Sequence, residues 1–133
     1  MLRGPNSKLW ARQRPADQRH SVGVARGVAE RLPGAEQPVL AAALLHDIGK
    51  LDADFGVPGR TLATLIGLVG GARARRGQGR IARYLDHEAI GASWCAELGA
   101  DPVTVALVGR SPTAPPDALH ALCHADDSAG RVR

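Results

Sequence analysis

An apolar run in the chain ends in two residues that can bind a metal ion, His46 and Asp47. Residues 39–45 before them are wholly apolar, which predicts that the pair lies at the end of a buried helix. Burying an imidazole and a carboxylate is costly unless the two are paired or bound to a metal. Taken alone, the pair is better explained by a hydrogen bond between the two side chains with a helix cap than by a metal site.

Further imidazole and carboxylate groups occur in two other expected helices. His20 lies in the first of these, and Asp126 and Asp127 lie in the last. Two imidazoles and two carboxylates would form a mixed nitrogen and oxygen site, which suits Mn, Fe, Zn, Co or Ni better than Ca or Mg. Because these segments are far apart in the chain, their spacing leaves open whether they converge.

The elements that would position these groups are all expected to be helical. Asp17 is the expected N-cap of the first helix, Pro38 suits the first turn of the second, and Gly99 is a suitable stop for a later one. The run 61–69 fits a helix or a strand and is assigned to helix from its context. The expected helices span residues 17–32, 38–48, 61–69, 81–98, 102–108 and 117–128, with loops at 52–59, 70–79 and 111–116.

The expected fold is therefore all-α. Residues 16–133 are predicted to form a compact single-domain bundle of about six helices, preceded by an N-terminal arm of residues 1–15. The chain of 133 residues suits one domain, and its aromatic content of 3% favours closely packed helices over a β-sandwich. The net charge of +4 rests on arginine, which could attract phosphate-bearing ligands, although a compositional bias is the simpler explanation.

Nothing in the sequence indicates secretion or insertion into a membrane. Residues 1–19 are polar and basic and lack the apolar core of a signal peptide. No stretch approaches the roughly 20 apolar residues of a membrane span. Cys95 and Cys123 lack the spacing of a zinc knuckle, and nothing points to an oxidising compartment. The expected location is the cytoplasm, with no membrane partner.

Four stretches form a pattern in chain order: His20, the segment AALLHDIGK over 42–50, the segment DHEAIGA over 86–92 and the segment LCHAD over 122–126. Together they resemble the HD superfamily of metal-dependent phosphohydrolases, whose ligand pattern is His, His-Asp, Asp. The likeness covers about residues 17–130, nearly the whole chain. Its most specific part is the HDIGK string within an Ala/Leu-rich helix.

The resemblance implies an HD-domain-like fold and one divalent metal ion bound by His20, His46, Asp47 and Asp126. Asp126 fits the family's Ala-Asp position better than Asp127, for which a solvated helix residue is the plain alternative. Some binuclear relatives carry another histidine before the last helix, and residues 107–111 contain none. The resemblance therefore favours one metal ion over two.

Three further residues are expected near a bound phosphate. His87 matches a histidine that many family members use to bind a second metal or a substrate phosphate. The equal alternative is that His87 is an exposed residue on a polar helix face. Lys50 could neutralise a phosphate oxygen and contribute to catalysis, or it could be a surface lysine at a helix end. Arg110 is a third candidate for contact with the phosphate.

The implied activity is hydrolysis of a phosphate ester by a metal-activated water. Asp47 and Lys50 would be the catalytic residues, and Lys50, His87 and Arg110 would bind a small phosphorylated substrate. A nucleotide is the commonest substrate class among the relatives and is the expected one. The alternative is a non-catalytic regulatory or partner-binding HD module that binds a metal or nucleotide. Nucleic acid is not an expected partner, since the arginines of 73–83 lack interleaved aromatics.

Overall fold

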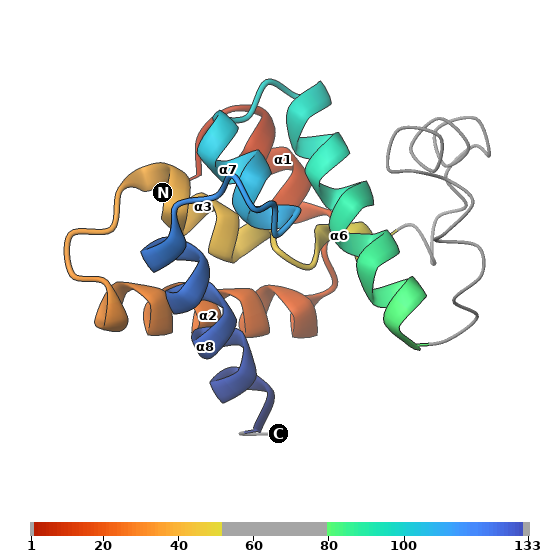
Figure 1. Ribbon diagram of the computed structural model, residues 1–133. Helices are drawn as coiled ribbons and strands as arrows, with labels where there is room; N and C mark the ends of the chain where they lie inside the picture. Colours follow the sequence, from red (N-terminus) through yellow and green to blue (C-terminus); the bar gives the residue numbers. More distant parts are fainter. Residues whose placement is uncertain (1, 52–79, 132–133) are drawn as a thin grey trace.

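Six α-helices and one short 3₁₀ helix form the described part of the chain (Figure 1). The computed structural model describes residues 2–51 and 80–131, and the predicted all-α class is confirmed there, since these residues contain no strand. None of these helices combines the length and the apolar composition that crossing a membrane requires. The elements are α1 (Pro5–Ala11), α2 (Pro15–Arg31), α3 (Gln37–Leu45), η1 (Ile48–Leu51), α6 (Arg80–Glu97), α7 (Pro102–Val108) and α8 (Pro116–Arg131).

Helix α3 is the most buried element, as its apolar sequence predicts. It packs against α2 on one side and against α1 and α7 on another. Because its side chains are short, the neighbouring helices approach it closely. Its buried residues are Val39, Ala41, Ala42, Ala43 and Leu45. The chain leaves this helix at His46, so His46 and Asp47 lie at the bottom of the core, at 3% and 8% exposure.

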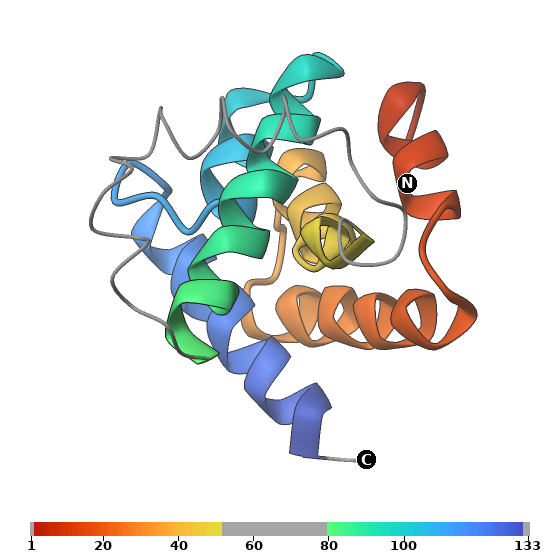
Figure 2. The ribbon, with the colours of Figure 1, turned by 90° about the vertical axis from the view of Figure 1, so that its right-hand side faces the viewer.

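Helices α2 and α8 cross each other below α3 (Figures 1 and 2). Val24 and Val28 of α2 are fully buried, and α8 buries Ala118, Ala121, Leu122 and Ala125. Small residues on both helices allow this close crossing. As a result His20 and Asp126 come into contact although 106 positions separate them in the sequence.

Two glycines allow η1 to lie directly against α6. A Cβ on Gly49 would overlap the carbonyl oxygen of His87, and a Cβ on Gly91 would lie 3.0 Å from a methyl group of Ile48. The Gly49 position leaves no room for a Cβ, so only glycine fits there, and the Gly91 contact is tighter than most side-chain contacts. The contact holds His87, on α6, beside Asp47.

The N-terminal segment differs from the arm that the sequence predicted. Residues 5–11 form helix α1, which packs against α3. Leu9 is buried, the indole nitrogen of Trp10 donates to Ser21 Oγ at 3.1 Å, and the amide of Gln13 donates to the Leu44 carbonyl at 3.1 Å. These long-range contacts stabilise a helix too short to form alone.

Some helix ends also differ from their predicted positions. The prediction of Asp17 as an N-cap is wrong: Arg14 is the N-cap, Pro15 begins α2, and Asp17 lies in the first turn, where an acidic side chain is favourable. Helix α3 stops at Leu45 instead of near Gly49. Gly99 has the positive φ of 73° expected of a helix stop. The segments predicted over residues 52–79 lie outside the described residues.

Candidate metal centre

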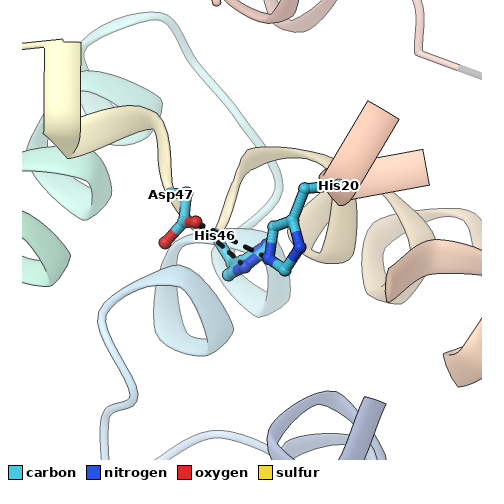
Figure 3. Close-up of side chains that lie close together, drawn as sticks. All are labelled: His20, His46 and Asp47. Carbon is cyan, nitrogen blue, oxygen red and sulfur yellow. Dashed lines mark ion pairs between the residues drawn. The ribbon is translucent and has the colours of Figure 1, made fainter. Parts of the chain in front are cut away.

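The four residues predicted as metal ligands come together in one cluster. His20 comes from α2, His46 and Asp47 follow α3, and Asp126 comes from α8. His20 Nε2 lies 3.1 Å from Asp126 Oδ1 and 3.8 Å from Asp47 Oδ2. His46 Nε2 lies 3.3 Å and 3.5 Å from the same two oxygens. Figure 3 shows the two imidazoles and Asp47 facing one another.

These distances resemble those between the donor atoms around a bound metal ion. With metal–ligand bonds of about 2.1 Å, neighbouring donors in a tetrahedron lie roughly 3.4 Å apart. The four distances of 3.1–3.8 Å bracket that value. His20, His46 and Asp47 each offer a ligand atom within 4.8 Å of the others. His20, His46 and Asp47 could therefore hold an ion together, and Asp126 contacts both imidazoles.

The hydrogen bonding of His46 leaves the nitrogen that faces the cluster without a proton in the neutral ring. Its Nδ1 lies 2.8 Å from the carbonyl oxygen of Ala43, so Nδ1–H donates there. Nε2 is then an acceptor, and it is buried without a hydrogen-bond partner among the described residues. An acceptor that faces two carboxylate oxygens requires a positive charge between them, either a proton or a metal ion.

The two carboxylates are strongly biased toward the ionised form. Burial raises the pKa of Asp126, but its close contacts with His46 and His20 lower that pKa by more, to about 2. Burial likewise raises the pKa of Asp47, and its contacts with His87, His46 and Lys50 together hold it well below the usual range. Two ionised carboxylates beside two imidazoles form a site that favours a cation.

The structure separates the two neighbouring aspartates at the end of α8. Asp126 is partly buried and faces the imidazoles, whereas Asp127 is exposed to solvent. Of the two alternatives, only Asp126 lies in the cluster.

Two of the residues predicted to contact a phosphate lie around Asp47. Lys50 Nζ donates to Asp47 Oδ2 at 2.6 Å, and its side chain is half exposed at the rim of the cluster. His87 Nε2 lies 3.6 Å from the other oxygen, Asp47 Oδ1, and its side chain is 13% exposed. Both residues are therefore placed within reach of a group bound beside Asp47.

Arg110, the third such residue, contacts two carboxylates of the protein itself. Its Nη2 donates to Asp126 Oδ2 at 3.0 Å, and its Nε lies 2.7 Å from Glu88 Oε1. Glu88 is 4% exposed, and burial raises its pKa, although Arg110 opposes that rise. Arg110 also adopts a positive φ of 48°, which costs a non-glycine residue some energy. In this arrangement Arg110 holds the oxygen of Asp126 that points away from the imidazoles.

Sequence reasoning did not identify the roles of Glu88 and Gly49. Glu88 adjoins His87 in the DHEAIGA segment. The signal that could have identified it is a charged residue on a face of α6 that is otherwise buried. Gly49 lies inside the HDIGK string, but its need for a Cβ-free contact with α6 depends on a segment about 40 positions away.

We expect the metal-free protein to lose stability as pH rises through the range where His46 releases its proton. Burial lowers the pKa of His46, but Asp126, Asp47 and the Ala43 carbonyl raise it by more, so it lies above 6.5 in the folded state. A raised folded-state pKa stabilises the fold fully below the unfolded value, and that contribution is lost above the folded one.

The release of this one proton should lower the free energy of unfolding by at most about 1.4 kcal/mol per pH unit. Urea unfolding of chelator-treated protein between pH 6 and 9 measures it. A midpoint that rises steadily with pH over this range would contradict the assignment.

No protein-family model matches the chain, and no match is found among curated proteins or solved structures.

Proposed function

We propose that this protein is an HD-type, metal-dependent phosphohydrolase that acts on a small phosphorylated substrate, most simply a nucleotide, in the cytoplasm. The observation that supports the proposal is the pair of imidazole Nε2 atoms that face the same two carboxylate oxygens at 3.1–3.8 Å. His46 Nε2 is buried and lacks a hydrogen-bond partner among the described residues, which fits a role as a metal ligand.

The residues fit one divalent ion bound by His20, His46, Asp47 and Asp126. Two nitrogen and two oxygen donors suit Mn, Fe, Co, Ni or Zn, and suit Mg less well. An ion of this kind lowers the pKa of water and offsets negative charge on a phosphate. The backbone carbonyl of Ala43 orients His46, and Arg110 orients Asp126 through its second oxygen. Such outer contacts fix the direction of ligand atoms.

The residues at the rim would bind and orient the phosphate. Lys50 is half exposed, and its ammonium group can turn from Asp47 toward a phosphate oxygen. His87 lies on the opposite oxygen of Asp47 and can donate to the substrate or accept a proton from an attacking water. Arg110 is already paired with Glu88 and Asp126, so we assign it the positioning of Asp126 in place of direct substrate binding.

Hydrolysis by the purified protein tests the proposal. The substrates are a panel of nucleotides, a generic phosphomonoester and a generic phosphodiester, each with Mn, Co, Ni, Zn and Mg. We expect turnover that requires added metal and is strongest with one of the first four ions. If the protein binds metal and hydrolyses none of these substrates, the regulatory or partner-binding module becomes the better explanation.

A further inference from the structure

A second feature adjoins His20. Between α2 and α8 runs an open groove of about 760 Å³, and His20 is one of its lining residues. Its volume falls in the range of about 300–1,000 Å³ typical of small-molecule sites. The other ligands, His46, Asp47 and Asp126, do not line it. His20 is therefore the residue that the groove and the cluster share, and its Nε2 faces the cluster.

Small residues make the groove hollow. Gly23 and Gly27 from α2 and Ala125 and Ala129 from α8 line it, so the side chains at these four positions take up little of the space between the helices. A Cβ on Gly23 would meet no other atom within 4 Å. A ligand can therefore approach the backbone of α2 closely at this point.

The rim of the groove carries a concentrated positive charge. All three arginines of α2, Arg19, Arg26 and Arg31, line it, against one acidic residue, Glu30. A general excess of arginine would scatter these residues around the helix, whereas here they share one face. Arg31 is fixed across the groove, since it donates to the Gly27 carbonyl and to Ser128 Oγ.

Arg19 and Arg26 are exposed and have no hydrogen-bond or ion-pair partner within residues 2–51 and 80–131. Seven positions, two helical turns or about 10 Å, separate them along α2. Guanidinium groups bind phosphate in a bidentate manner. Apart from the imidazole of His20, none of the described residues that line the groove is aromatic, so their chemistry suits phosphate groups better than a stacked base.

We propose that this groove binds the phosphate groups of the substrate that are not hydrolysed, so that the preferred substrate carries a chain of phosphates. This inference rests on the proposed function, which places the reacting phosphate next to His20. The chain of phosphates could belong to an inorganic oligophosphate or to a nucleoside polyphosphate.

Direct binding tests the groove without turnover. Tripolyphosphate and a nucleoside triphosphate are titrated calorimetrically into the metal-free wild type, the Arg19→Ala/Arg26→Ala variant and an Arg3→Ala/Arg12→Ala control. The control removes the same charge from exposed sites outside the groove. We expect the groove variant to bind tripolyphosphate about tenfold more weakly than the control. Gly23→Leu, which fills the groove and keeps every charge, should weaken binding similarly.

Equal tripolyphosphate affinity in the groove variant and the control would overturn the inference. Tighter binding of the nucleoside triphosphate than of tripolyphosphate would identify the nucleotide as the source of the phosphates. In the kinetic arm, the groove variant should raise KM for a triphosphate about tenfold and leave kcat and the KM for p-nitrophenyl phosphate unchanged. Binding lost in the groove variant, without hydrolysis in the wild type, would support the groove and contradict only the proposed function.

Discussion

Gly49→Ala is expected to destabilise the protein by about 3 kcal/mol or more, which lowers the Tm by roughly 10 °C. Nothing in the backbone torsions of Gly49 requires glycine, because its φ is not positive. The effect is steric: the new methyl group would overlap the backbone carbonyl oxygen of His87, which cannot move without moving α6. Separation of η1 from α6 would also withdraw His87 from Asp47. Thermal unfolding followed by circular dichroism measures the change.

Gly23→Ala is the matched control for this substitution. It adds the same methyl group to a helical glycine where the new Cβ meets nothing within 4 Å. Because alanine forms helices better than glycine, this variant should be more stable by about 0.5–1 kcal/mol. A Gly49→Ala protein with the Tm of the wild type would show that η1 and α6 do not pack as the structure has them.

Asp47→Ala is expected to remove metal-dependent turnover and to weaken metal binding more than about 100-fold. Asp47 contacts His20, His46, His87 and Lys50, so it links both imidazole ligands to the residues at the rim. Without its carboxylate, the two close imidazoles retain, among the described residues, only Asp126 as an acidic partner. Initial rates with the best metal and substrate, together with metal content after dialysis, measure the loss.

Asp127→Ala serves as the control for Asp47→Ala. Asp127 neighbours the expected ligand Asp126 but is exposed to solvent, so its removal should leave rate and metal content within about twofold of the wild type. Retained turnover in Asp47→Ala, or equal losses in the two variants, would contradict the assignment of ligands.

Most of the helices could be predicted because their signals are local. The prolines, glycines and apolar spacing that define 102–108 gave its observed bounds, and the apolar run before His46 marked the buried helix. Helix α1 could not be predicted in this way, since Trp10 and Gln13 stabilise it through contacts with Ser21 and the Leu44 carbonyl. The N-cap at Arg14 has no side-chain hydrogen bond, and the signal that marks this helix start is Pro15 at its first position.

The candidate site, like the fold, could be predicted from the sequence only in part. The resemblance to the HD pattern selected His20, His46, Asp47 and Asp126, and the structure brings them together. The role of Arg110 could not be predicted, because it depends on Glu88 and Asp126, which come from two other helices. The gathering of the α2 arginines at one groove could not be predicted either, because it depends on the packing of α2 against α8.

Calorimetric titration of the chelator-treated protein with Mn²⁺ and Zn²⁺ tests most directly whether these four residues hold one divalent metal ion. The wild type should bind one ion per chain, more tightly at pH 8 than at pH 6, because His46 must lose its proton to bind. His46→Gln should bind at least about 100-fold more weakly. Absence of stoichiometric binding in the wild type, or unchanged affinity in His46→Gln, would contradict the account.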